Sequence, residues 1–284
     1  MAEPRFGLLG ASSFVGQEAS RQLRARGLSH VAYSRQARHE PGVDWRQIDA
    51  PTAPPPLEGW ISLAPIWTLP RLFPLFEATG ARRIVALSST SRFTKEDSGN
   101  TGERRLAQSL AEGEEALQAW AESRGVAWTI LRPTLIHGYG QDRNIAEIAA
   151  FIRRFGFFPV VGDAQGVRQP VHVTDVAGAC IAALTKAQPI NRCYTLSGRD
   201  ILTYREMVER IFLALGRPVR IFPVPLGAVR AGLAIMRLLP RYRHLTIAMA
   251  ERMNKNMSFD HQDAAHDLGF QPRGFDPEPQ DTWV

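Results

Sequence analysis

The first residues whose types and spacing could do chemistry lie in the stretch F-G-L-L-G-A-S-S-F-V-G, residues 6–16. A short apolar run precedes Gly10, a small polar loop follows, and after Gly16 the residues have the mixed character of an amphipathic helix. Gly10 permits a tight turn off a strand, Gly16 lets a helix pack closely, and the helix N-terminus offers free N–H groups to a pyrophosphate. The stretch therefore predicts a dinucleotide site, the alternative being a plain connection between a strand and a helix.

A serine stands where the middle glycine of such a loop usually lies, since the spacing is Gly10-x-x-Ser13-x-x-Gly16. Serine is small enough to let the backbone approach a ligand, and its hydroxyl can donate a hydrogen bond to a phosphate oxygen. We expect the whole loop to contact the cofactor, through Gly10, Ser12, Ser13, Phe14, Val15 and Gly16.

The end of the second predicted strand, residues 30–33, bears on the choice of cofactor. A site specific for NAD(H) usually places an acid here to bind the ribose hydroxyls, whereas this sequence has Ser34 followed by Arg35. A guanidinium suits the 2′-phosphate of NADP(H), so the sequence favours NADP(H) over NAD(H). The alternative is an ordinary surface arginine that follows a strand.

A run of hydroxyl side chains follows the most apolar predicted strand, residues 83–87. Ser88, Ser89 and Thr90 come directly after it. The carboxyl ends of parallel strands face the ligand crevice of an open α/β sheet, so these hydroxyls are candidates for contact with a ligand. Turn residues are the alternative interpretation.

The pattern of apolar runs predicts the scaffold that positions these groups. Predicted strands alternate with predicted helices as far as about residue 185, which is typical of a doubly wound, Rossmann-type α/β fold with a parallel sheet. The predicted strands are 6–9, 30–33, one ending at 48–49, 60–64, 83–87 and 126–131, and the predicted helices follow Gly16 and span 69–79 and 103–124.

The character of the sequence changes beyond Pro189, where a smaller, mostly helical lobe is expected. Thr203 and Glu206 have the spacing of a capping box at the start of a helix that Gly216 would end. We therefore predict a dinucleotide-binding domain over residues 1–188, with a segment of the substrate lobe near 141–170. The C-terminal substrate lobe is predicted over 189–284.

Composition limits the classes of protein that remain. With 284 residues, 44% of them hydrophobic, the chain can bury a large core, and its net charge of +6 suits an anionic ligand. Nucleic acid is the rival partner, but Lys/Arg-rich runs and zinc-finger spacing are missing, so neither nucleic acid nor a metal is expected. The two cysteines, Cys180 and Cys193, have the sequence context of buried apolar residues.

The apolar segment 224–239 is interrupted by Arg230 and Arg237 and ends at Pro240, so no membrane span is expected. The sequence also starts without the charged and then apolar pattern of a signal peptide. A cytoplasmic protein is therefore expected, and a homodimer is the assembly considered for it.

Seven short motifs in a fixed order resemble the extended short-chain dehydrogenase/reductase superfamily, specifically NAD(P)-dependent epimerase/dehydratase-like proteins. The resemblance runs nearly end to end. The motifs are G-A-S-S-F-V-G at Gly10, I-S-L-A-P at Ile61, V-A-L-S-S-T-S at Val85, L-R-P-T-L-I-H-G at Leu131, R-Q-P-V-H-V-T-D-V-A at Arg168, L-S-G-R-D-I-L-T-Y-R-E at Leu196 and D-L-G-F-Q-P at Asp267.

The resemblance implies roles for individual residues. Asp49 would contact the adenine, and Pro133 and Thr134 would close over the nicotinamide. Thr90, with Ser89 next, matches the residue that hydrogen-bonds the substrate oxygen that gains or loses a proton. The cofactor contacts implied beyond the glycine loop and Ser34-Arg35 are Asp49, Leu63, Ala64, Pro65, Ser88, Pro133 and Thr134.

This sequence departs from the family at its acid–base pair. The family uses a tyrosine and a lysine four residues later, and aligning the glutamates of the long helix puts Ala107 and Ala111 at those positions. In the resemblance, His137 and Tyr139 lie near the nicotinamide and become the candidate acid–base groups. The alternative for His137 is a loop residue that is hydrogen-bonded to the backbone.

Arg168 matches the arginine that holds the substrate diphosphate in nucleotide-sugar members of the family, the alternative being a salt bridge to an acid such as Asp163. Two functions stay open. One is an NADP(H)-dependent oxidoreductase or epimerase acting on an anionic, sugar-like or nucleotide-sugar substrate. The other is a non-catalytic NADP(H)-binding sensor or assembly scaffold.

Overall fold

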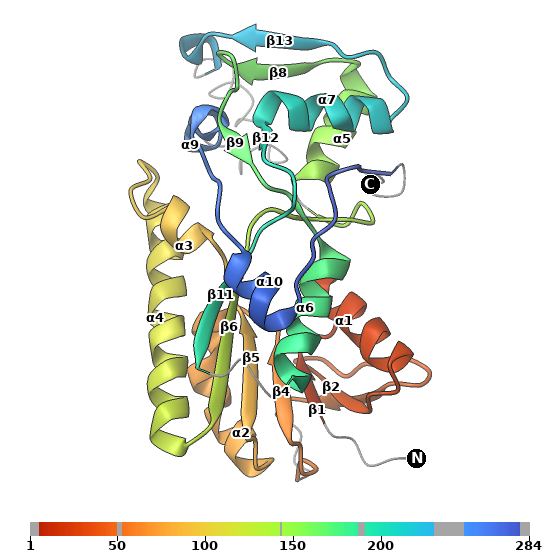
Figure 1. Ribbon diagram of the computed structural model, residues 1–284, viewed down its shortest axis with the longest axis vertical. Helices are drawn as coiled ribbons and strands as arrows, with labels where there is room; N and C mark the ends of the chain where they lie inside the picture. The colour runs from red at the N-terminus through yellow and green to blue at the C-terminus, as the bar shows by residue number, and fades with distance from the viewer. Residues whose placement is uncertain (1–5, 50–52, 143, 187–190, 230–246, 279–284) are drawn as a thin grey trace.

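A seven-stranded parallel sheet forms the centre of the computed structural model, which describes residues 6–49, 53–142, 144–186, 191–229 and 247–278 (Figure 1). The strand order is β11-β6-β5-β4-β1-β2-β3, and each neighbouring pair is parallel. The order reverses between β1 and β4, which is where such sheets bind ligands. The strands are β1 Phe6–Leu9, β2 His30–Ser34, β3 Asp44–Gln47, β4 Gly59–Ser62, β5 Arg83–Leu87, β6 Ala127–Pro133 and β11 Arg192–Leu196.

Helices cover both faces of this sheet, so the predicted Rossmann-type α/β fold is confirmed. One face packs against α1 (Phe14–Ala25), α6 (Val173–Thr185) and α10 (Gln262–Leu268), and the other against α2 (Phe73–Ala78) and α4 (Thr101–Arg124). Each face has its own core of buried apolar residues. Cys180 is buried in α6 and Cys193 is half-buried on β11, and both are free thiols.

The predicted helix over 69–79 is divided in the structure. A 3-10 helix, η1 (Ile66–Leu72), contains Pro70, and α2 begins one residue before Pro74. Proline lacks the N–H that an α-helix needs in its interior but fits its first turn, so two prolines four residues apart favour two short helices.

A smaller lobe sits at the carboxyl end of the sheet, at the top of Figure 1. Its core is formed by residues between Ile145 and Phe275. The capping box that Thr203 and Glu206 were predicted to form is present at the start of α7. The elements of the lobe are α5 Ile145–Phe155, β8 Phe158–Val161, β9 Val167–Arg168, β12 Leu202–Thr203, α7 Tyr204–Ala214, β13 Ile221–Val224, α9 Ile247–Glu251 and η3 Arg252–Asn254.

The predicted boundary between residues 188 and 189 does not separate the sheet from the lobe. β11 follows this boundary and pairs with β6 in the main sheet, and α10 packs against β11 and α6. The reason is that the chain enters the lobe after β6, returns for α6 and β11, enters the lobe again and returns for α10. Both parts are therefore built from alternating segments of the sequence.

Among the helices of the described residues, none has the length and apolarity needed to cross a bilayer. Most of the predicted apolar segment 224–239 lies outside the described residues, because the description stops at 229 and resumes at 247.

Candidate functional site

The glycine loop has the tight geometry that its sequence predicts. Gly10 has φ +73°, and a Cβ there would lie 2.9 Å from the carbonyl carbon of Leu63. A Cβ on Gly16 would lie 2.1 Å from the carbonyl oxygen of Gly10. Neither position can hold a larger residue without moving the backbone, because Cβ atoms do not approach other heavy atoms this closely.

The first turn of α1 is capped by Ser13, whose Oγ accepts a hydrogen bond from the Gly16 N–H at 3.1 Å. The hydroxyl hydrogen of Ser13 is then the group left to donate to a phosphate. Within the described residues the N–H groups of Phe14 and Val15 have no acceptor, and the first turn contains no acidic residue. This positive helix end fits the pyrophosphate of a dinucleotide.

The segment after β4 lies against this loop. The Leu63 N–H donates to the Leu9 carbonyl at 2.9 Å, and the Leu63 backbone faces Gly10. The structure therefore brings the predicted cofactor-lining residues Leu63, Ala64 and Pro65 to the predicted pyrophosphate loop.

The end of β2 presents basic side chains to solvent. Ser34 is buried and its hydroxyl donates to the Gln36 carbonyl, which fixes the turn after the strand. Arg35 is exposed, and so is Asp49, beyond β3. Arg38, which the sequence interpretation did not single out, lies three residues after Arg35 and places its guanidinium 5.9 Å from the ring centre of Trp45.

The three predicted hydroxyls at the end of β5 all make hydrogen bonds inside the protein. Ser88 donates to the Glu114 carboxylate, and the Ser89 Oγ accepts from the Ser91 N–H at 3.0 Å. The Thr90 Oγ1 donates to the Pro133 carbonyl at 3.1 Å. Thr90 and Pro133 thus lie together at the carboxyl ends of β5 and β6, with the Thr90 hydroxyl directed at the backbone.

Glu114 is a buried carboxylate beside this site that the sequence interpretation missed. It accepts hydrogen bonds from Arg132 at 2.6 and 3.0 Å, and also from Arg92 and Ser88. Burial raises its pKa, but the bonds from Arg132 and Ser88 outweigh burial and hold the pKa below its ordinary value. Helical spacing could have found it, because Glu114 lies four residues after Leu110 and three before Leu117, both buried.

His137 is 2% exposed and lies inside the connection between sheet and lobe. It pairs with His172 through the short strands β7 (Ile136–His137) and β10 (Val171–His172). Its ring centre is 5.2 Å from that of His172 and 4.9 Å from that of Phe275. This environment closes His137 off from solvent.

Tyr139 also lies next to His172, with ring centres 5.4 Å apart. It is 39% exposed, has φ +51°, and its hydroxyl lies 3.1 Å from the Thr174 Oγ1 at the start of α6. A positive φ is energetically unfavourable for a non-glycine residue, so the surrounding structure has to hold Tyr139 in this conformation. The structure therefore places both candidate acid–base groups next to the His172 ring.

Arg168 is buried, and its guanidinium is bonded to backbone carbonyls. It donates to the carbonyls of Val167 and Lys255 at 2.7 and 2.8 Å, and to that of Arg252. Burial lowers the pKa of Arg168 to about 10. The alternative salt bridge to Asp163 is not formed, since no carboxylate in the described part of the chain pairs with Arg168.

Arg252 lies next to Arg168 at the junction of lobe and sheet, and Lys95 lies near Arg252. Arg252 forms an ion pair with Glu103 at the start of α4. Burial lowers the pKa of Lys95, and the charge of Arg252 lowers it further. We call Lys95, Arg168 and Arg252 the junction cations. Glu103 pairs with Arg252 and attracts Lys95, so the interactions of these groups join three positive charges to one negative charge.

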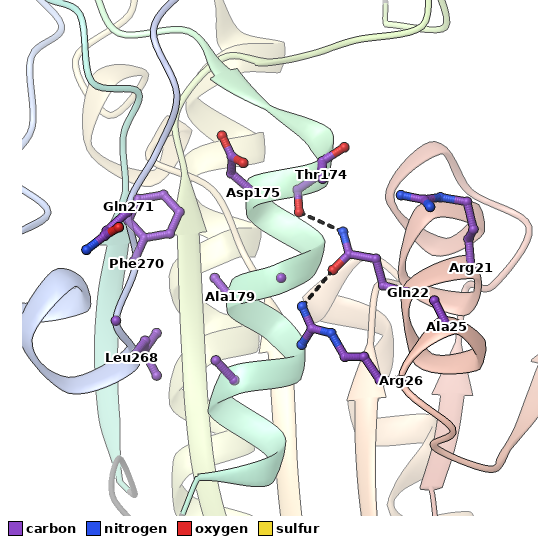
Figure 2. A pocket seen from close by; sticks show the side chains of 13 residues that line it. Arg21, Gln22, Ala25, Arg26, Thr174, Asp175, Ala179, Leu268, Phe270 and Gln271 are labelled. Atoms are coloured by element: carbon purple, nitrogen blue, oxygen red, sulfur yellow. Dashed lines mark hydrogen bonds between the residues drawn. The ribbon is translucent and has the colours of Figure 1, made fainter.

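A cavity of about 510 Å³ lies elsewhere, between α1 and α6 (Figure 2). Its polar lining is bonded together, since Gln22 donates to the Thr174 carbonyl at 2.9 Å and accepts from Arg26 at 3.1 Å. Asp175, on its rim, is paired with Arg273 at 2.9 Å. Because it lies between two helices that cover the sheet, this cavity is separate from the glycine loop.

Comparisons with known proteins agree with this geometry. Residues 71–196 match the family model described as "NAD dependent epimerase/dehydratase family". The chain is 32% identical over 129 residues to the Arabidopsis thaliana protein "NADH dehydrogenase (ubiquinone) 1 alpha subcomplex subunit 9, mitochondrial", across 45% of this chain and 31% of that protein. It is 27% identical over 119 residues to the UDP-glucose 4-epimerase of Vibrio cholerae, across 42% of this chain and 36% of that one. The matches thus span about a third of these relatives.

Solved structures match over nearly the whole chain. MoeE5 in complex with UDP-glucose and NAD has a TM-score of 0.68 at 18% identity, across 98% of this chain and 97% of that one. The UDP-glucose 4-epimerase of Thermotoga maritima has a TM-score of 0.65 at 16% identity, across 94% and 93%. At these low sequence identities, the solved structures show that this chain shares their fold.

Proposed function

We propose that this chain, a member of the NAD(P)-dependent epimerase/dehydratase-like family, binds NADP(H) at the glycine loop. It would act as an oxidoreductase or epimerase on an anionic, nucleotide-sugar-like substrate. The observation that carries the proposal is the excess of positive charge at the junction cations, beside the carboxyl end of a Rossmann-type sheet.

The glycine loop and the N-terminus of α1 hold the pyrophosphate in this proposal. Arg35 binds the 2′-phosphate, Asp49 the adenine, and Leu63 to Pro65 with Pro133 and Thr134 line the path to the nicotinamide. When bound, the nicotinamide supplies or accepts the hydride. Support comes from the close approach at Gly10 and Gly16 and from the exposed guanidinium of Arg35.

The junction cations hold the phosphate groups of the substrate. Three carbonyls orient the Arg168 guanidinium, and a buried cation without a carboxylate is stabilised when an anion arrives. Lys95 adds a second charge, whereas Arg252 is already paired with Glu103. A diphosphate supplies the negative charge that would balance the junction cations.

Proton transfer has to proceed without the tyrosine and lysine of the family, since Ala107 and Ala111 stand in their places. Thr90 orients the substrate oxygen, and His137 or Tyr139 exchanges the proton. Because general acid–base catalysis contributes roughly 10²–10⁴-fold, turnover is expected to be slow.

Titration with nucleotide-sugars tests the substrate proposal. Arg168→Ala and Lys95→Ala are expected to weaken binding of a nucleoside diphosphate sugar by about tenfold or more and to leave NADP(H) affinity unchanged. Arg105→Ala, at an exposed position on α4, is the control. If no nucleoside diphosphate sugar binds the unmodified protein, the substrate is of another class.

The proton-transfer proposal is tested by the pH profile of hydride transfer. We expect the pH dependence of the rate to reflect His137 and the rate to fall with His137→Ala. Rapid turnover that survives both His137→Ala and Tyr139→Phe would exclude both candidates.

A second candidate function is a non-catalytic NADP(H)-binding sensor or assembly subunit. The observations that favour it are the internal hydrogen bonds of Ser88, Ser89 and Thr90 and the burial of His137. Tight NADP(H) binding without hydride transfer to any carbonyl compound would select this candidate.

A further inference from the structure

Four phenylalanine rings form a connected group at the end of the small lobe farthest from the sheet. They come from the last turns of α5, from the loop between α5 and β8, and from β13, which Figure 1 shows at the outer end of the molecule. Ring centres are 4.6 Å apart for Phe151 and Phe155, 6.3 Å for Phe155 and Phe157, and 5.8 Å for Phe157 and Phe222.

Two of these rings are strongly exposed, Phe155 at 45% and Phe222 at 53%. Leu213 and Val219, from the end of α7 and the segment before β13, are also exposed. The core of the lobe is complete beneath them, with Phe158 and Phe212 buried. Single exposed apolar residues are normal, but a connected group of aromatic rings marks a surface that another body covers.

The charged residues nearest to these rings in the sequence are arginines. Arg153, Arg154, Arg217 and Arg220 flank them, and the Arg154 guanidinium lies 5.4 Å from the Phe155 ring centre. The sequence has no aspartate or glutamate from Ile148 to Gly162, nor from Arg210 to Ala250. We call these four arginines, with Phe151, Phe155, Phe157 and Phe222, the tip surface.

A partner that covers the tip surface has to supply anions for the arginines and an apolar environment for the phenylalanine rings. A second copy joined by a two-fold axis is disfavoured, because the four arginines of each copy would face those of the other. The surface of an anionic bilayer supplies both, since its phosphates attract arginines and its interfacial region accommodates aromatic rings.

We propose that the tip surface attaches the protein peripherally to an anionic phospholipid bilayer. Phe155 and Phe222 enter the interfacial region, and the four arginines contact lipid phosphates. The sheet lies toward the other end of the molecule and stays in water (Figure 1). This attachment is independent of the proposed activity, because none of its residues contacts the glycine loop or the junction cations.

Flotation of the full chain with vesicles tests the proposal. Vesicles of phosphatidylcholine with about 30% phosphatidylglycerol should carry the protein at low salt, and vesicles of phosphatidylcholine alone should not. The double change Arg154→Gln with Arg220→Gln should weaken partitioning by about thirtyfold, or about fivefold for each arginine. Phe155→Ser with Phe222→Ser should weaken it by at least about tenfold.

Matched controls distinguish binding through the tip surface from binding through the net positive charge of the whole protein. Arg82→Gln with Arg105→Gln removes two exposed charges from the sheet part, and Trp67→Ser removes an exposed aromatic ring there. These variants should partition like the unmodified protein, and every variant should keep its thermal midpoint. Equal losses in control and tip variants would overturn the proposal, because binding would then reflect net charge alone.

Two other results would also overturn it. One is equal binding to anionic and neutral vesicles. The other is a concentration-dependent dimer that Phe155→Ser abolishes, without binding to vesicles, since the tip surface would then be a contact between copies or with another protein.

Discussion

At the scale of single residues, the contact between α1 and the glycine loop depends on Gly16. A side chain there would meet the carbonyl of Gly10, so Gly16→Val should push α1 away from the loop and abolish NADP(H) binding while the sheet still forms. Calorimetric titration with NADPH, alongside circular dichroism, measures both outcomes. Gly99→Ala is the control, because a Cβ at Gly99 has no neighbour within 4 Å. Normal binding by the Gly16 variant would remove the loop from the site.

Arg35 is expected to set cofactor preference. Charge-assisted hydrogen bonds contribute about 1.5–3 kcal/mol, so Arg35→Ala should weaken NADP(H) binding by about tenfold or more. NAD(H) binding should not change, because NAD(H) lacks the 2′-phosphate. Titration of both cofactors against the unmodified protein and the variant measures this. A tighter complex with NAD(H) than with NADP(H) in the unmodified protein would refute the assignment.

The glycine loop and the end of β2 could be located from the sequence because each is one continuous segment whose spacing encodes its turn. The burial of His137 under Phe275, and the carbonyls of Arg252 and Lys255 beside Arg168, could not be. They depend on residues more than eighty positions away that share no local pattern with their partners.

At the level of elements, Glu114 ties α4 to β5, to β6 and to the helix α3 (Ser91–Thr94) through Ser88, Arg132 and Arg92. Glu114→Gln leaves the partly buried Arg132 without a carboxylate and Arg92 with only Glu115 at 3.9 Å, so it should lower the free energy of unfolding by about 3–5 kcal/mol. Urea denaturation measures the change. Glu115→Gln, on the exposed side of the same helix, is the matched control and should change it by less than about 1 kcal/mol.

Acid should remove the same stabilisation. The pKa of Glu114 is lower in the folded protein than in the unfolded chain, so its contribution is present above the unfolded pKa and is lost as pH falls through the folded pKa. The difference in stability between the unmodified protein and Glu114→Gln should therefore shrink below about pH 4.5. A constant difference down to pH 3 would contradict this.

The long helix containing Glu114 was predicted from periodicity almost to its observed ends, 103–124 against Thr101–Arg124. The same periodicity marks position 114 as inward-facing, but only the fold supplies Arg132 and Arg92, which make a buried carboxylate acceptable there. The helix predicted over 69–79 is two elements in the structure, η1 and α2. Pro70 lies inside η1, and Pro74 fits only the first turn of an α-helix, so α2 begins there.

On the scale of the whole molecule, the ion pair of Arg252 with Glu103 joins the lobe to α4. Arg252→Gln should lower the free energy of lobe opening by about 1.5–3 kcal/mol, so exchange of buried amides around residues 252–259 should become about ten- to a hundredfold faster. Hydrogen exchange read by mass spectrometry measures this. Arg205→Gln, which removes an i,i+4 pair within the lobe, should leave this exchange unchanged.

The return of the chain to the sheet for β11 also has a consequence on the ribosome. β6 is complete at Pro133, but the strand that covers its outer edge starts only at Arg192. While the intervening residues are synthesised, the nascent sheet ends in an open row of N–H and C=O groups. Such edges recruit other extended chains. Translation pauses between these two points therefore lengthen the interval in which this protein depends on chaperones, and a chain released within it carries an aggregation-prone edge.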